Sequence, residues 1–164
     1  MDEKKEDEFS RFETYHGPKL VYNEILLDHF TNPRNTGEIK DASGVAMVGD
    51  PMCGDSVKLF IKVENDILKK VTYQVFGCGA AIATSSILSE LATGKTIDEA
   101  LVITDDDVIE AAKGIPERKA HCSLLAVQAL HEAIGDYLIK KSQEDNELFK
   151  FRTNSIDESE RNGK

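Results

Sequence analysis

Three cysteines stand in settings that suggest metal or sulfur chemistry. Cys53 lies two residues before Asp55, Cys78 lies between two glycines, and Cys122 directly follows His121. Thiolate sulfur is a ligand both for zinc and for iron-sulfur clusters. The cysteines are too far apart in the sequence to form the close pairs of a zinc-finger knuckle, so the fold itself must bring three distant loops together. The sequence therefore predicts one shared site assembled by the whole domain.

A [2Fe-2S] cluster needs four protein ligands, and the cysteines supply only three of them. Asp55 and His121 are the two candidates for the fourth ligand, because each lies close to a cysteine in the sequence. A carboxylate or an imidazole in place of one thiolate makes the ligand shell less uniform. We therefore expect a cluster held loosely enough to leave, which suits assembly and delivery better than electron transport.

Two other kinds of chemistry suit the same residues. Three thiolates with Asp55 or His121 would also satisfy a tetrahedral zinc ion. Alternatively, an activated cysteine, Cys122 or Cys78, accepts a persulfide from a donor enzyme while the neighbouring acid and histidine manage protons. Lys119 lies near the His-Cys pair and could steer sulfide or a partner toward it. These interpretations are not mutually exclusive.

Alternating and helical patterns predict the elements that position the site. A period of two over residues 57–63 and 71–75, with turn formers at 64–66, predicts a hairpin, and the apolar stretch at 45–48 predicts an edge strand. Helical spacing predicts a first helix at about 20–30, a helix from residue 80 to Gly94, two short capped helices that start at Thr96 and Thr104, and a long helix that begins near His121. The fold class is therefore α+β, with a small antiparallel sheet of about three strands and helices packed on it.

The predicted elements place each cysteine at a junction. Cys53 lies before the hairpin, Cys78 lies between a strand and a helix, and Cys122 lies at the start of the last helix. The positive end of a helix lowers the pKa of a nearby thiol, so we expect Cys78 and Cys122 to ionise readily.

Composition limits the class of protein. The 164 residues carry a net charge of -10, which argues against binding to nucleic acid. No apolar run approaches the roughly 20 residues that span a bilayer, and the charged N-terminus is unlike a signal peptide. We expect a cytoplasmic protein that does not bind membranes, with a flexible charged arm at 1–19, one domain at 20–140 and a polar tail at 141–164 that is disordered or loosely docked.

Several segments together resemble the iron-sulfur cluster assembly scaffold IscU and the related N-terminal domain of NifU. The similarity runs from about Leu20 to Tyr137. Its motifs, which agree in order and spacing, are Asp28-His29-Phe30, Asn32-Pro33-Arg34-Asn35, Cys53-Gly54-Asp55, Gly77-Cys78-Gly79 and His121-Cys122.

The resemblance implies a scaffold rather than an enzyme. Such a protein accepts sulfur from a cysteine desulfurase, works with iron and electron donors, assembles a labile [2Fe-2S] cluster on Cys53, Cys78 and Cys122 with Asp55 or His121 as fourth ligand, and passes the cluster to apo-proteins. The resemblance also implies that zinc can occupy the cluster-free site, that Asp55 favours cluster release, and that the fold is of the SufE/IscU type.

One segment departs from the family pattern. Members served by a dedicated ATP-driven chaperone carry Leu-Pro-Pro-Val-Lys before the His-Cys pair, whereas residues 115–119 of this chain read Ile-Pro-Glu-Arg-Lys, which argues against delivery by that chaperone. The SufU branch, a zinc-dependent sulfurtransferase, has an insertion between the second and third cysteines and lacks the histidine before the last one. This chain has neither mark, so the scaffold is favoured and the zinc-bound sulfurtransferase is the alternative.

Overall fold

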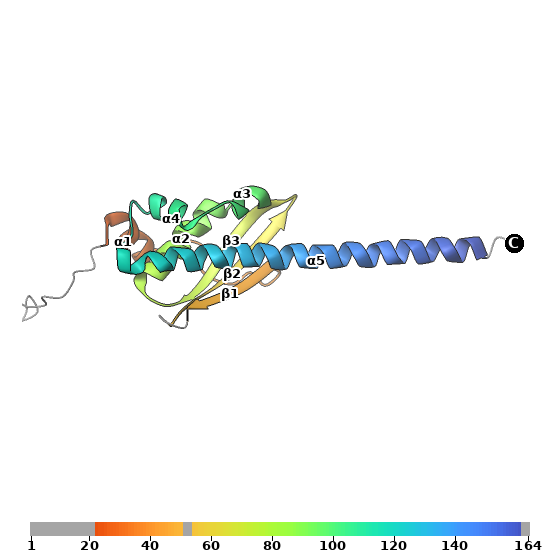
Figure 1. Ribbon diagram of the computed structural model, residues 1–164, viewed down its shortest axis with the longest axis horizontal. Helices are drawn as coiled ribbons and strands as arrows, with labels where there is room; N and C mark the ends of the chain where they lie inside the picture. Colours follow the sequence, from red (N-terminus) through yellow and green to blue (C-terminus); the bar gives the residue numbers. More distant parts are fainter. Residues whose placement is uncertain (1–21, 51–53, 162–164) are drawn as a thin grey trace, which may run out of the picture.

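A computed structural model of the chain describes residues 22–50 and 54–161 (Figure 1). The predicted arm at 1–19 and Cys53 lie outside the described residues. The elements follow in the order α1 (Glu24–Thr31), β1 (Gly44–Asp50), β2 (Asp55–Glu64), β3 (Ile67–Phe76), α2 (Gly79–Ala92), α3 (Ile97–Leu101), α4 (Asp105–Ala111), the 3-10 turn η2 (Glu117–Lys119) and α5 (Ala120–Arg161).

The three strands form one antiparallel sheet in the order β1-β2-β3, which confirms the predicted α+β class and the predicted hairpin. The hairpin turn consists of Asn65 and Asp66, whose φ angles are 53° and 60°. Two left-handed residues in a two-residue loop match the right-handed twist of the flanking strands. Asn and Asp tolerate this conformation better than other residues with side chains, so the local sequence fixes where the hairpin turns.

Two helices cover the sheet. α5 packs on β1 and β2, α2 packs on β3, and the two helices contact each other (Figure 1). A Cβ atom at Gly44 would lie 2.2 Å from the carbonyl oxygen of Ala133, so β1 and α5 can approach this closely only because residue 44 is a glycine. The next residue along β1, Val45, donates its N–H to the Asp136 carboxylate at 2.9 Å. This contact fixes α5 along the edge strand.

The segment that follows α1 is bonded to the buried hydroxyl groups of α2. The Ser86 Oγ atom lies 2.7 Å from His29 Nδ1 and accepts the Arg34 N–H at 2.9 Å. The Asn35 side chain donates to Ser89 Oγ at 3.0 Å. Residues that carry the family resemblance therefore hold α1 and its loop against α2, the helix that begins directly after Cys78.

α1 begins at Glu24, later than predicted, because Asn23 caps it. The Asn23 side chain accepts the Leu26 N–H at 2.9 Å, and its amide group donates to the carbonyl oxygens of residues 112–114 at 2.8 to 3.3 Å. A single side chain thus caps the start of α1 and satisfies the carbonyl groups of the three residues that follow α4. This double role depends on a contact between distant parts of the chain, so the sequence did not reveal it.

Both predicted short helices are present. Thr96 and Glu99 form a reciprocal capping box at the start of α3, and Thr104 and Asp107 form another at the start of α4. In each box the hydroxyl accepts a backbone N–H while the carboxylate bonds back to the capping residue. The prediction from the spacing of hydroxyl and carboxylate is confirmed in both places.

α5 differs from the prediction at its end. The sequence predicts that the helix stops near Lys140 and that a disordered or loosely docked tail follows, whereas α5 continues to Arg161. No glycine or proline interrupts residues 136–161, and most of these residues tolerate helix well, so nothing ends the helix near Lys140. In the described part of the chain, no helix is long and apolar enough to cross a membrane.

Candidate metal centre

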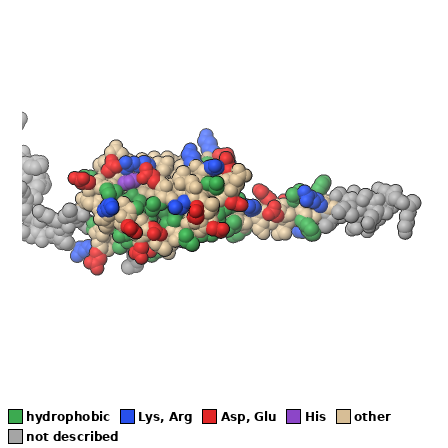
Figure 2. Space-filling model, turned by 90° about the horizontal axis from the view of Figure 1, so that it is seen from above, with side chains coloured by type: hydrophobic (Ala, Val, Ile, Leu, Met, Phe, Trp, Pro, Cys, Tyr) green, Lys and Arg blue, Asp and Glu red, His purple; other side chains and the backbone are tan. Residues whose placement is uncertain are grey.

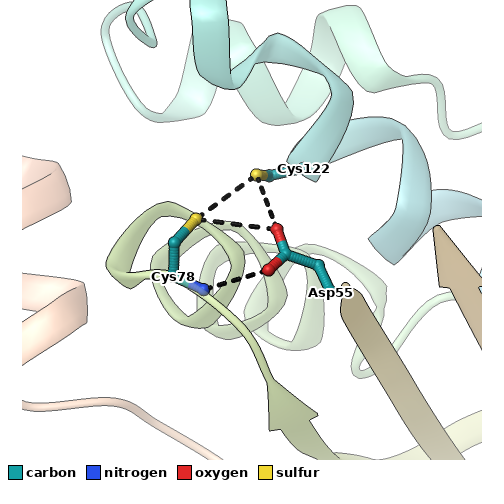
Figure 3. A group of neighbouring side chains, drawn as sticks. All are labelled: Asp55, Cys78 and Cys122. Atoms are coloured by element: carbon teal, nitrogen blue, oxygen red, sulfur yellow. Dashed lines mark hydrogen bonds between the residues drawn. The ribbon is translucent and has the colours of Figure 1, made fainter. Parts of the chain in front are cut away.

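Two of the predicted cysteines and Asp55 meet at one end of the sheet. The Sγ atoms of Cys78 and Cys122 are 3.7 Å apart, and Asp55 Oδ2 lies 3.7 Å from Cys78 Sγ and 3.8 Å from Cys122 Sγ (Figure 3). One ligand atom from each of the three residues lies within 4.8 Å of the other two. Tertiary structure thus assembles the predicted site from elements far apart in the sequence, although Cys53 lies outside the described residues.

Each of the three residues occupies the end of a different element. Asp55 is the first residue of β2, Cys78 immediately precedes α2, and Cys122 lies in the first turn of α5. Cys78 has an extended backbone, and its thiol makes no capping hydrogen bond to α2, so the sulfur points toward the other two residues instead (Figure 3). Cys122 is fully buried and Asp55 is 7% exposed, whereas Cys78 is only half-buried.

The Asp55 carboxylate is held by the backbone beside Cys78. Its Oδ1 atom accepts the Cys78 N–H at 3.2 Å, which leaves Oδ2 directed toward the two thiols. A Cβ atom at Gly77 would lie 2.6 Å from Oδ1, so the carboxylate reaches this position only because residue 77 has no side chain. The glycine before Cys78 therefore has a direct role in placing the acid.

His121 lies at the edge of the group. Its Nε2 atom is 3.6 Å from Cys122 Sγ and 3.9 Å from Asp55 Oδ2, and its side chain is 32% exposed. The imidazole is thus near two of the three residues, and it is more open to solvent than Asp55 or Cys122. Both predicted candidates for the fourth ligand lie within a short side-chain movement of the thiols.

The charge state of Cys122 differs from the expectation. We expected the start of α5 to lower its pKa, but burial raises the pKa of the Cys122 thiol, and the neighbouring Cys78 and Asp55 raise it further. Lys119 opposes this effect only in part. Burial of the thiol and the negative groups beside it raise the pKa of Cys122 by more than the start of α5 can lower it. Metal binding at Cys122 must therefore displace a proton.

Lys119 and Tyr22 complete the surroundings of the thiols. The interaction with Cys78 is the main cause that raises the pKa of Lys119, which places the lysine near the thiols, while its auxiliary role stays a prediction. Burial, followed by the charge of Cys78, raises the pKa of Tyr22, which packs against the small buried cluster that contains Cys122. Sequence reasoning missed Tyr22. Its place directly before the cap of α1 was the available signal, but only the fold brings that cap to the site.

The donor set limits what the centre can hold. Two thiol sulfurs and a carboxylate oxygen, with an imidazole nearby, are ligands that both zinc and iron accept. The residues come from a strand and two helices that pack together, so the spacing of the donors is largely set by the fold.

Comparison with known families agrees with this geometry. The family model for the NifU-like N-terminal domain matches residues 21–144. The chain belongs to this family. Membership of the NifU-like N-terminal domain family confirms the resemblance inferred from the cysteine, aspartate and histidine motifs.

Curated relatives are 42% to 52% identical to the chain over the aligned residues. The iron-sulfur cluster assembly scaffold protein IscU 1 of Archaeoglobus fulgidus is 52% identical over 76% of this chain and 82% of its own length. IscU of Aquifex aeolicus is 49% identical over 74% of this chain and 79% of its own length. IscU of Escherichia coli K12 is 42% identical over 74% of this chain and 98% of its own length. All three names describe assembly scaffolds and not enzymes, which agrees with the role expected from the resemblance.

Solved structures share the fold. The NifU-like N-terminal protein from Brucella abortus has a TM-score of 0.63 at 21% identity and covers 73% of this chain and 96% of its own. A scaffold protein for the SUF system from Fervidobacterium islandicum has a TM-score of 0.56 at 21% identity, with 69% and 96% covered. At this identity the likeness concerns the fold of the NifU-like domain alone.

Proposed function

We propose that this chain is a scaffold on which a labile [2Fe-2S] cluster is assembled and from which it is passed to apo-proteins. The observation that carries the proposal is the convergence of Cys78, Cys122 and Asp55 within 4.8 Å of one another. Family membership and the names of the relatives support the scaffold role. In this proposal the cluster is cargo, built and released at each cycle.

We assign Cys53, Cys78 and Cys122 as the thiolate ligands, with Asp55 or His121 as the fourth. The Oδ2 atom of Asp55 lies 3.7 and 3.8 Å from the two described sulfurs, so it needs little movement to share an iron with either. An oxygen or nitrogen ligand gives the cluster one weaker bond than a shell of four thiolates. The cluster is released through that bond.

Sulfur reaches the scaffold as a persulfide on a cysteine desulfurase. A thiolate of the scaffold attacks the terminal sulfur, forms a new S–S bond and releases the thiolate of the desulfurase. The acceptor is Cys122 or Cys78, and because their sulfurs are 3.7 Å apart, sulfur taken up by one lies within reach of the other. The interaction with Cys78 is the main cause that raises the pKa of Lys119, so this side chain stays charged beside the acceptor sulfur.

Iron and electrons come from separate donors, and acceptor apo-proteins take the finished cluster. The departures at residues 115–119 argue against transfer through the dedicated chaperone. We place the protein in the cytoplasm, because thiols that must stay reduced to bind metal are maintained there.

Anaerobic reconstitution tests the function. Ferrous iron, cysteine, a desulfurase and a thiol reductant that reduces the persulfide sulfur to sulfide should produce visible charge-transfer absorption with about two irons per chain. Cys78→Ser and Cys122→Ser should each lose most of that absorption, whereas Asp41→Asn, at an exposed acid that bonds Lys62 away from the thiols, should keep it. A colourless protein with one tightly held zinc that only accelerates desulfurase turnover would instead support the zinc-bound sulfurtransferase. The three thiol and carboxylate donors suit that ion as well.

A further inference from the structure

Two motifs of the family resemblance have no part in the proposed function. Asp28-His29-Phe30 lies in the last turn of α1, and Asn32-Pro33-Arg34-Asn35 follows that helix directly. Among the described residues, the group of donor atoms at the candidate metal centre includes none from these motifs. α1 nevertheless packs on α2, the helix that begins directly after Cys78 (Figure 1). α2 therefore connects the motifs to the site.

Polar contacts hold the end of α1 on one face of α2. The buried His29 lies 2.7 Å from Ser86 Oγ through its Nδ1 atom and 3.7 Å from Glu90 Oε2 through its Nε2 atom. The Arg34 Nε atom lies 3.9 Å from the other carboxylate oxygen of Glu90. Residues seven and four apart lie on the same side of a helix, so Gly79, Ser86 and Glu90 share one face of α2. The contacts therefore place α1 over the face that begins at Gly79.

The ring of Phe30 lies against the first residue of α2. A Cβ atom at Gly79 would lie 3.1 Å from two carbon atoms of the ring, whereas ordinary contacts begin at 3.4 Å. The ring lies this close to the backbone because residue 79 has no side chain. Phe30 is 43% exposed, and over the end of the domain that carries α1 Figure 2 shows hydrophobic side chains at the surface among acidic and basic ones. A partly exposed ring thus rests on the backbone next to Cys78.

The two glycines beside Cys78 have different contacts. At Gly77 the backbone leaves room for Asp55, which also accepts the Cys78 N–H, and at Gly79 it leaves room for Phe30. Glycine has more conformational freedom than any other residue, so a Gly-Cys-Gly segment without such contacts would sample many conformations. The acid restrains one end of the segment, and the ring restrains the other.

We propose that Phe30 is a positioning residue of the candidate metal centre. Through its contact with Gly79, the ring keeps residues 77–79 in the conformation that directs the Cys78 sulfur toward the other donors. Ligands that are held in place before a metal binds lose less conformational freedom on binding, so the ring raises metal affinity without touching the metal. The inference rests on the proposed function only for the metal, because the restraint on Cys78 is present in the metal-free protein as well.

Zinc affinity and the reactivity of Cys78 test the role of the ring. In Phe30→Ala we expect zinc affinity, measured by competition with a chromophoric chelator, to fall about tenfold or more. In the metal-free form of the same variant, iodoacetamide should alkylate Cys78 several-fold faster, as measured by peptide mass spectrometry. Phe30→Tyr keeps the ring carbons that lie on residue 79 and should match the native chain in both measurements. Leu27→Ala removes another apolar side chain of α1, 49% exposed, and should also match the native chain.

A second substitution tests the contact from its other side. Gly79→Ala places a methyl group 3.1 Å from the ring, so in the native background it should lower zinc affinity and speed the alkylation of Cys78. In the Phe30→Ala background the methyl group meets no ring, and the same substitution should cause no further loss. Circular dichroism checks that each variant keeps its fold. Gly79→Ala leaves Phe30 in place, so it tests the contact even if Phe30→Ala does not fold.

Three outcomes would overturn the proposal. The first is native zinc affinity and a native alkylation rate in folded Phe30→Ala or in Gly79→Ala. The second is an equal loss from Gly79→Ala in both backgrounds, and the third is a Phe30→Tyr variant that behaves like Phe30→Ala. Alkylation needs no metal, so it tests the ring even if the native chain assembles no cluster. Cluster reconstitution of the native chain does not depend on these results, and the two proposals can fail separately.

Discussion

Gly77→Ala should disable the candidate metal centre without changing any of its ligands. A Cβ atom at residue 77 would lie 2.6 Å from Asp55 Oδ1 and 2.9 Å from its Cγ. Ordinary contacts of this kind begin at 3.4 Å, so the carboxylate would have to retreat by about 0.8 Å. Metal–oxygen bonds of about 2.0–2.2 Å cannot stretch that far, and the hydrogen bond from the Cys78 N–H would also be strained.

The expected magnitudes follow from these contacts. Overpacking at a buried position costs about 1–3 kcal/mol, so we expect the free energy of unfolding in urea to fall by that amount. Displacing a ligand or its support typically lowers metal affinity on the order of tenfold to a hundredfold. Competition with a chromophoric chelator measures this loss for zinc.

Gly49→Ala is the matched control. It adds the same methyl group to a strand, but the nearest atoms lie at 3.6 and 3.7 Å, which is ordinary contact. Its zinc affinity should equal that of the native protein. If Gly77→Ala binds zinc as tightly as the native chain and is equally stable, the proposed placement of Asp55 by the backbone at residue 77 is wrong.

Three further predictions concern single side chains. Asn23→Asp keeps the cap of α1 but places a carboxylate against three carbonyl oxygens, so urea unfolding should show a loss of about 1–3 kcal/mol; unchanged stability would contradict the double role. Hydrogen bonds from Lys140 and from the Val45 N–H lower the pKa of Asp136 below its ordinary 3.8. The stabilisation by the ionised Asp136 is present above pH 3.8 and is lost as the pH falls through the lower pKa of the folded state. The stability advantage of the native chain over Asp136→Asn should therefore shrink below about pH 4. A difference in stability that stays constant with pH would refute this prediction. Asp55→Ala should lengthen the lifetime of a reconstituted cluster in oxygen-free buffer, because it removes the weakest ligand; a shorter lifetime would count against that role.

Local patterns in the sequence were sufficient for most of the secondary structure. The alternation around Val57 and Val71 predicted the hairpin, and the capping boxes at Thr96 and Thr104 predicted two helix starts, because these features depend on residues close together in the chain. The end of α5 was predicted wrongly. Its polar composition suggested a disordered tail, but composition alone does not separate an exposed helix from a coil, and no glycine or proline marks an end.

The candidate site likewise has a part that local sequence predicts and a part that only packing determines. Residue types and their neighbours pointed to Cys78, Cys122, Asp55 and His121 as candidate donors, because the chemistry of a donor atom belongs to the residue. The contact between Tyr22 and the site, and the placement of Asp55 by the backbone at Gly77, could not be foreseen, because both depend on which elements pack together.

The sequence by itself determined which donor atoms this protein can offer to a metal and where its strands and most of its helices begin. Only the tertiary structure decided that Asp55 and two of the thiols lie within 4.8 Å of one another, and that the Cys122 thiol holds its proton more tightly than a free cysteine does. The physical reason is that distances between remote segments and the desolvation of a buried group arise from packing, which brings together residues that no local pattern in the chain connects.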